Sequence, residues 1–148
     1  MRRPRTYDRL NLDLDPAEPA EPRPPPREYK HGSFDYERLD AATVARDALA
    51  QGEAIARALP ADSAYLAEQR RRALLDAYLG VAETASQTGP PRVARARATR
   101  ASASAAAAAL DAIRLLGLVP ADQLVPTTEL LGRLCAMLTR LAARTLPR

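Results

Sequence analysis

The sequence predicts an all-α protein, an antiparallel up-down-up-down four-helix bundle that follows a disordered, proline-rich N-terminal arm. From about residue 39 onward, apolar residues recur at the spacings of three, four and seven that are typical of amphipathic helices. Prolines and glycines divide this stretch into four segments of similar length with short connections, which favours antiparallel neighbours. Strands are poorly supported, since period-two alternation and clusters of β-branched or aromatic residues are missing.

The first 33 residues differ sharply in composition from the rest. They hold seven of the thirteen prolines, with a run at residues 22–26, and seven basic side chains against six acidic ones. Few large apolar residues are present, so this segment cannot bury enough surface to offset the entropy lost on ordering. We therefore expect residues 1–33 to be a disordered, partly polyproline arm and residues 34–148 to form one domain.

The first helix is expected to run from about Leu39 to Leu59, where Pro60 ends it. Four residues define its apolar face, namely Val44, Ala48, Ile55 and Leu59.

The second helix is expected from about Ala64 to Ser86, with Asp62 or Ser63 as the N-cap. Its apolar side comprises Leu66, Ala73, Ala77 and Val81. The sequence Gly-Pro-Pro at residues 89–91 ends any continuation.

The third helix is expected to begin near Pro91, because proline is tolerated in a first turn, and to continue to Leu116. The alanine run at residues 105–109 combines the highest helix propensity with little bulk, so neighbouring helices can approach it closely. Gly117 is the expected left-handed C-terminal cap, followed by Pro120.

The last helix is clearest from Thr127 to Thr145. Its heptad seam is Leu130, Leu134, Met137 and Leu141. Pro126 is either its first-turn residue or a kink in a helix that already begins near Pro120.

The residues that support most enzyme chemistry are scarce. His31 is the only histidine and lies in the arm, and Cys135 is the only cysteine, so no metal site, no cofactor site and no serine triad is predicted. Six scattered glycines form no phosphate-binding loop, and Asp76 and Glu83 stand two helical turns apart, too far for a catalytic dyad. The chain is therefore expected to be non-enzymatic, with no catalytic residue and no small-molecule substrate, and Cys135 is expected to be a small buried hydrophobe.

The same residues indicate a cytoplasmic location. One cysteine excludes an internal disulfide and fits a reducing compartment. No apolar run is long enough to span a bilayer, and the N-terminus is charged where a signal peptide would be apolar, so no membrane association is expected.

Arginine is the remaining chemical signal in a chain of net charge +4. Residues 70–72 are three consecutive arginines that span most of a helical turn, so at least two of them should remain in water. Four more cover one side of the third helix, Arg92, Arg95, Arg97 and Arg100. If these helices are antiparallel neighbours, the two groups form separate basic zones at opposite ends, and a stripe needs an oligomer or the arginines at 133, 140 and 144 of the last helix.

Two functional interpretations follow from this charge. Arg71, Arg72, Arg92, Arg95, Arg97 and Arg100 are the candidate residues for binding the phosphate backbone of RNA or DNA. Alternatively, the arginines only solubilise the helix surface through ion pairs, and the protein is a structural or protein-interaction bundle whose alanine-rich face packs against another subunit. One phenylalanine and no tryptophan argue against base stacking.

Two helices also carry a family resemblance. Gln69, Arg71, Arg72, Ala73, Val81, Ala82 and Glu83 match the family pattern in the second helix, and Arg100, Ser102, Leu110, Asp111, Leu116 and Gly117 match it in the third. The opening FDYERL at residues 34–39 and the closing Met-Leu-Thr at 137–139 with Leu141 also fit. The chain thereby resembles the four-helix bundle proteins encoded by 23S ribosomal RNA intervening sequences and the accessory variability proteins of diversity-generating retroelements. Three positions depart from the pattern: Gly80 replaces an asparagine, Thr84 a glycine, and Ala105 a common acidic residue.

The resemblance covers about residues 34–145 and implies more than the composition does. Members of that family are non-enzymatic, and the retroelement accessory proteins are basic homopentamers that bind a reverse transcriptase and its template RNA. By resemblance, we expect a divergent member that acts as an oligomeric adaptor, with Arg71, Arg72, Arg97 and Arg100 in contact with phosphates.

Overall fold

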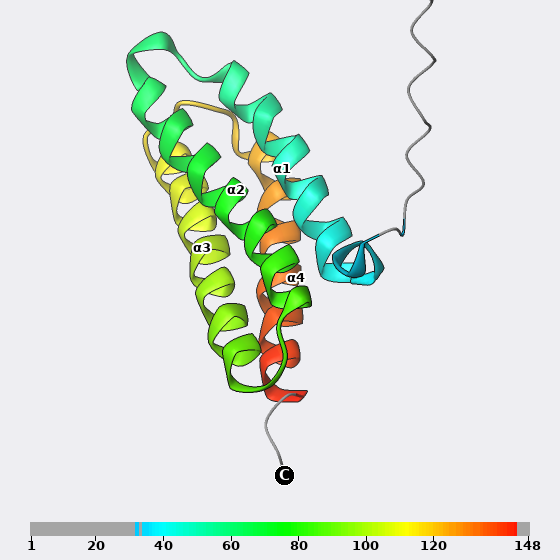
Figure 1. Cartoon of the computed structure of the whole chain (residues 1–148). Helices are drawn as coiled ribbons and strands as arrows, with labels where there is room; N and C mark the ends of the chain where they lie inside the picture. Colours follow the sequence, from blue (N-terminus) through cyan, green and yellow to red (C-terminus); the bar gives the residue numbers. More distant parts are fainter. Residues whose placement is uncertain (1–31, 33, 145–148) are drawn as a thin grey trace, which may run out of the picture.

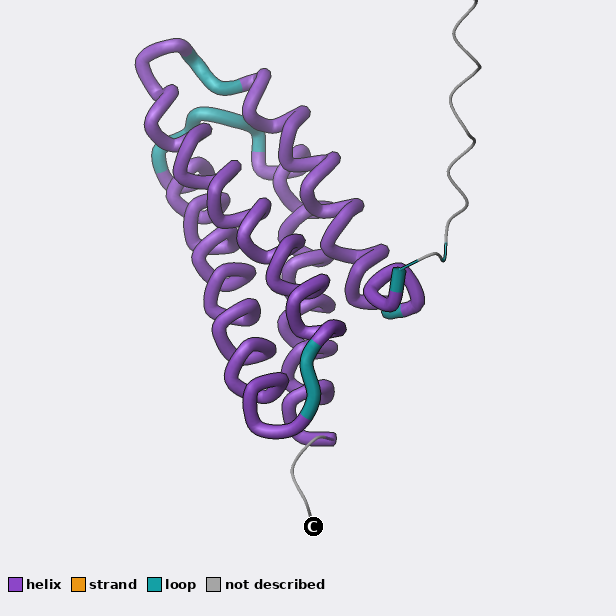
Figure 2. The backbone as a smooth tube through the Cα atoms, viewed as in Figure 1, coloured by secondary structure: helices purple, strands orange, loops and turns teal. Residues whose placement is uncertain are grey.

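The computed structural model describes residue 32 and residues 34–144 of the chain. Within that part it contains helices and no strands, which confirms the all-α prediction (Figures 1 and 2). The order of elements is η1 (Asp35–Arg38), α1 (Asp40–Ala58), η2 (Ala61–Ser63), α2 (Ala64–Ser86), α3 (Gly89–Leu115) and α4 (Ala121–Arg144). The predicted disordered arm, apart from Gly32, and the predicted helix end at Thr145 lie outside the described residues.

Four long helices lie side by side, and each packs against two others (Figure 1). α1 contacts α2 and α4, and α3 contacts the same two helices from the other side. The start of α3 lies beside the end of α4, since residues 96–100 and 138–143 line one groove. The start of α1 lies beside the end of α4 and beside Tyr78 in the second half of α2. One end of the molecule therefore carries the starts of α1 and α3 together with the ends of α2 and α4.

The predicted helix ends agree with the structure in most respects. α2 has the predicted bounds, and Gly117 adopts a φ of +64° after α3, so that the Leu118 amide donates to the Ile113 carbonyl at 3.2 Å. Ser63 occupies the N-cap position, but its hydroxyl makes no capping hydrogen bond and lies 3.4 Å from Asp62 Oδ1. Pro126 is inside α4, because this helix begins at Ala121, so the second of the two alternatives for Pro126 is the correct one.

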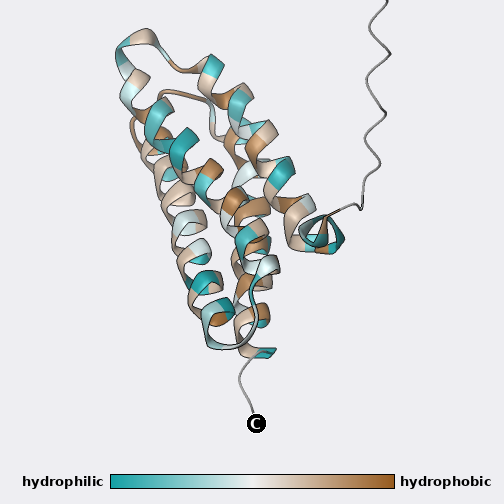
Figure 3. Ribbon diagram, viewed as in Figure 1, coloured by the Kyte–Doolittle hydropathy of each residue, from teal (hydrophilic) through white to brown (hydrophobic). Residues whose placement is uncertain are grey.

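The buried faces of the helices follow the predicted periodicity, with shifts on α2, where Leu66 and Ala73 are only half-buried, and on α4. On α1, Val44, Ala48 and Ile55 are buried as predicted. On α4 the fully buried seam is Thr127, Leu131, Leu134 and Leu138. Three of the four predicted seam residues, Leu130, Met137 and Leu141, are only half-buried. The seam is displaced because α4 packs against α1 and α3 at once, so its apolar face is wider than a two-helix seam. In Figure 3, brown hydrophobic segments alternate with hydrophilic ones along the helices.

Small residues allow two of the helices, α2 and α3, to pack closely against each other. A Cβ atom added at Gly80 of α2 would lie 2.9 Å from the Cγ2 atom of Thr99 on α3. The hydroxyls on either side bond within their own helices, from Thr84 to the Gly80 carbonyl at 2.7 Å and from Thr99 to the Arg95 carbonyl at 2.8 Å. Gly80, one of the departures from the family pattern, therefore lies at a close packing contact between α2 and α3, and Thr84, another departure, is buried one turn later on α2.

Candidate nucleic-acid interface

The three consecutive arginines of α2 lie in different environments. Arg70 is fully buried, and its Nη1 atom donates to the carbonyl of Gly52 on α1. Its Nε and Nη2 atoms have no hydrogen-bond partner among the described residues. Burial disfavours the charged guanidinium and lowers the pKa of Arg70. Arg71 and Arg72 are exposed, which agrees with the expectation that two of the three remain in water.

Arg71 is engaged in an ion pair across the α1–α2 contact. Its Nε and Nη2 atoms donate to the two carboxylate oxygens of Glu53 at 2.8 and 3.1 Å. This bidentate hydrogen bond raises the pKa of Arg71 and lowers the pKa of Glu53. Arg72 lies 3.8 Å from Glu68 one turn earlier on the same helix. Both arginines that the resemblance assigned to phosphate contacts on α2 therefore already face a carboxylate.

The first two arginines of α3 also face the protein. Arg95 forms an ion pair with Glu83 on α2. Arg92 is half-buried, and its Nε atom has no hydrogen-bond partner within the described part of the chain. Arg95 therefore contributes to the α2–α3 contact, and Arg92 is less accessible than the exposed arginines further along α3.

Arg97 and Arg100 have a different environment from the other four predicted site residues. Both are exposed, and within residues 34–144 no carboxylate lies at ion-pair distance from either of them. They line one side of a groove whose other side is formed by Leu138, Thr139, Ala142 and Ala143 of α4. Their guanidinium groups are therefore available to a ligand at the start of α3.

Two arginines that the site prediction left out lie on the other side of the same part of α4. Arg140 and Arg144 are exposed and line a second groove, between α4 and the α1 start at residues 39–41. The described residues offer neither of them an ion pair, although Asp40 lines the same groove. The sequence shows that these two arginines lie four residues apart near the end of the last helix. That this part of α4 lies beside the start of α3 could be learned only from the arrangement of the helices.

We call Arg97, Arg100, Arg140 and Arg144 the arginine track. The structure places these four along the two grooves that flank the end of α4, and Arg71 and Arg72 lie at the opposite end, near the α1–α2 connection. Two separate basic zones are thus present. In the zone at the α3 start, all four exposed guanidinium groups are without a carboxylate partner among the described residues.

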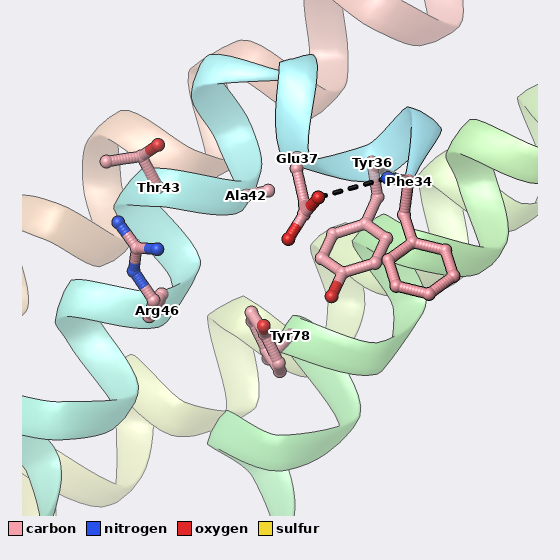
Figure 4. Close-up of a pocket in the computed structure, with 7 residues that line it drawn as sticks. All are labelled: Phe34, Tyr36, Glu37, Ala42, Thr43, Arg46 and Tyr78. Carbon is pink, nitrogen blue, oxygen red and sulfur yellow. Dashed lines mark hydrogen bonds between the residues drawn. The ribbon is translucent and has the colours of Figure 1, made fainter. Parts of the chain in front are cut away.

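A second feature at this end is an aromatic hollow, which the sequence did not reveal. It has a volume of about 520 Å³ and is lined by Phe34, Tyr36, Glu37, Ala42, Thr43, Arg46 and Tyr78 (Figure 4). The rings of Phe34 and Tyr36 stack with centroids 6.0 Å apart, and Tyr36 meets Tyr78 edge-on at 6.4 Å. Composition alone argued against base stacking, yet three of the six Phe and Tyr residues of the chain gather in this hollow.

The remaining candidate chemistry is sparse in the described residues. His, Cys, Asp and Glu side chains form no group there that could hold a metal ion. Cys135, predicted to be a small buried hydrophobe, is half-buried and packs against the hydrophobic core, and its sulfur lies 3.7 Å from Ser104 Oγ on α3. Among the described helices, none combines the length and the apolar character that a membrane crossing requires.

No protein-family model matches the chain, and no curated protein matches it either.

Proposed function

We propose that this protein is a non-enzymatic helical adaptor that binds the phosphate backbone of RNA or DNA through the arginine track. The observation that carries the proposal is the contrast between the two ends of the molecule. At the α1–α2 end, Arg71 and Arg72 face Glu53 and Glu68. At the other end, the four guanidinium groups of the track lack such partners among the described residues and flank adjacent grooves. Unpaired surface arginines are the groups that neutralise phosphates and release counterions.

The architecture that we propose for this adaptor is an antiparallel up-down-up-down four-helix bundle. The groove between α3 and α4 supports it, since it joins the start of one helix to the end of the other. The ion pairs Glu53–Arg71 and Glu83–Arg95 support the same arrangement for α1 with α2 and for α2 with α3. We place this adaptor in the cytoplasm, in keeping with its single cysteine.

The proposed relationship is to the four-helix bundle family of ribosomal intervening-sequence and retroelement accessory proteins, as a divergent member. The quoted residue pattern, the all-helical fold and the arginine distribution support it. By this relationship the protein is a homopentamer, and a reverse transcriptase is its protein partner. Among the four arginines that the resemblance implied for phosphate contacts, Arg97 and Arg100 have the environment that such contacts require.

The test is a salt titration of nucleic-acid binding by the full chain. Fluorescence anisotropy with a short labelled RNA should show affinity falling steeply between about 50 and 200 mM salt. The double variant Arg97→Gln with Arg100→Gln should weaken binding about tenfold or more and reduce the salt slope by about one for each phosphate that is no longer neutralised.

The matched control carries the same charge change at the other end of the molecule. Arg71→Gln with Arg72→Gln removes two arginines that already face carboxylates, so it should weaken binding much less. Undetectable binding at the low-salt limit would overturn the proposal. So would equal losses from the two double variants, because the effect would then reflect net charge alone.

A structural or protein-interaction bundle is the second candidate. Leu75 and Leu79 favour it, because they lie one turn apart on α2 and are 45% and 47% exposed. Light scattering of the full chain over the same salt range distinguishes the candidates when combined with the titration. Assembly that persists in salt without nucleic-acid binding would support this second function.

A further inference from the structure

The aromatic hollow lies at the same end of the molecule as the arginine track. We propose that it holds an unpaired base of a single-stranded nucleic acid whose backbone follows the track. This inference rests on the proposed function and adds base capture and a preference for single strands to it. Its basis is the position of the hollow, its lining and its size.

The hollow and the two grooves follow one another around the end of the bundle. The groove with Arg97 and Arg100 lies between α3 and α4, and the groove with Arg140 and Arg144 lies between α4 and the α1 start. The latter groove is lined by residues 39–41 of the α1 start, and the hollow is lined by residues of the same segment on either side of them, 34–37 and 42–46. We infer that a strand crossing the end of α4 along the track passes the first turn of α1 and enters the hollow on its other side.

The lining of the hollow is suited to a nucleobase. Flat aromatic faces attract bases of any sequence, because every base has a π-face. Phe34 is 54% exposed, and Figure 4 shows the Tyr78 ring at the base of the hollow, below the Glu37 carboxylate. The volume of about 520 Å³ falls in the range of about 300–1,000 Å³ that is usual for sites of small organic ligands.

Polar groups stand on the opposite side of the hollow from the Phe34 and Tyr36 rings. Figure 4 shows Arg46 and Thr43 there, both on α1. A guanidinium and a hydroxyl at this place can bind the phosphate adjoining a captured base. Glu37 is held in position by the amides of Gly32 and Phe34, which donate to its Oε2 atom at 2.8 and 3.0 Å. A carboxylate can accept hydrogen bonds from the amino group of a base.

A duplex cannot use this site without unpairing, because its bases are stacked inside the helix. The track would bind either form through phosphates, whereas the hollow would add affinity only for a strand with free bases. The preference for single strands over duplex is therefore the property that separates base capture from backbone binding.

The experiment measures binding of the full chain to a short single-stranded RNA containing 2-aminopurine and to the corresponding duplex. We expect the single strand to bind more tightly, with quenched 2-aminopurine fluorescence caused by stacking on tyrosine. Tyr78→Leu should weaken single-strand binding about tenfold, abolish the quenching and leave duplex binding unchanged. The matched control is Tyr65→Leu, because Tyr65 is 62% exposed on the same helix and lies outside the hollow.

A second variant guards against a folding defect in Tyr78→Leu. Arg46 is exposed, so Arg46→Gln should preserve the helical circular dichroism spectrum while weakening single-strand binding several-fold. Equal affinity of the wild type for single strand and duplex, or quenching that survives both hollow variants, would overturn base capture. NMR signals of the Tyr78 ring give a further test. Base capture would also be wrong if these signals shifted when a proline-rich peptide is added but not when single-stranded RNA is added.

Failure of the proposed function has a different signature. In that case neither form of RNA binds the wild type at low salt. If duplex and single strand both bind with a steep salt slope but the hollow variants change nothing, the backbone function stands and base capture alone is wrong.

Discussion

Arg70, Arg71 and Arg72 show how strongly the environment decides what a residue does. The three are identical in the sequence, yet one is buried against the Gly52 carbonyl, one binds Glu53 with both carboxylate oxygens, and one is mostly exposed beside Glu68. Helical geometry explains the difference, because consecutive residues are rotated by about 100° and only one of the three can face the core.

The buried guanidinium of Arg70 leads to a stability prediction. Two of its nitrogen atoms lack a hydrogen-bond partner among the described residues, and an uncompensated buried charge is destabilising. Methionine fills a similar length without a charge, so Arg70→Met should raise the free energy of unfolding by about 1–2 kcal/mol. Urea denaturation followed by circular dichroism measures this, with exposed Arg72→Met as the control. A large loss of stability in Arg70→Met would show that the guanidinium is better satisfied than the geometry indicates.

Glu53 leads to a prediction of pH dependence. Its pKa is below the ordinary glutamate value because Arg71 donates to the ionised carboxylate, so folding favours the deprotonated form. The stabilisation is therefore complete above the ordinary value of 4.5 and is lost as pH falls through the lower pKa of the folded state. The pair is partly exposed, so we expect Glu53→Gln to lower Tm at neutral pH by only about 1–2 °C.

The difference between Glu53→Gln and the wild type should shrink as the buffer becomes more acidic. Thermal melts across that range measure it. A difference that stays constant down to low pH would mean that the glutamine side chain perturbs packing and that the ion pair contributes nothing.

At the scale of helices, replacing a glycine by alanine is expected to change the stability of the protein in opposite directions at two positions. Gly80 lies at a close contact between α2 and α3, and an added Cβ would meet the Thr99 side chain. Gly132 is exposed inside α4, and an added Cβ there would have no neighbour within 4 Å.

The two alanine substitutions should therefore change stability in opposite directions. Gly80→Ala should lower the free energy of unfolding by about 1–3 kcal/mol, because the helices must separate. Gly132→Ala should raise it by about 0.5–1 kcal/mol, because alanine has the higher helix propensity. Chemical denaturation of both variants measures the two changes, and combining Gly80→Ala with Thr99→Ala should restore part of the loss. Equal effects at the two positions would contradict the close α2–α3 contact.

The elements were largely predictable from the sequence. Helical periodicity located all four helices, and glycine and proline located most of their ends, because these signals are local. One exception arose from contacts between helices and another from local backbone geometry. The α4 seam shifted because two neighbours pack against it, and Ser63 makes no capping hydrogen bond because its ψ of 18° lies outside the extended region that an N-cap adopts.

At the scale of the whole molecule, the candidate site was much less predictable than the fold. The arginines were visible in the sequence, but their partners Glu53 and Glu83 come from other helices, so pairing could not be read along one segment. The aromatic hollow combines residues 34–46 with Tyr78, two segments separated by most of a helical hairpin. Only the arrangement of helices decides which arginines stay free and which rings meet.

The contacts between the helices form a closed ring, and the interface between α1 and α4 differs from the others. Three interfaces join consecutive helices, whereas α1 and α4 come from opposite ends of the described chain. Closing that interface restricts the longest loop and so costs the most entropy, which makes it the natural place for a transient local opening. The second groove, with Arg140 and Arg144, lies directly on it. A nucleic-acid strand bound in this groove would contact both helices and hold the α1–α4 interface closed. The free energy of opening this interface would then increase with the affinity for the strand.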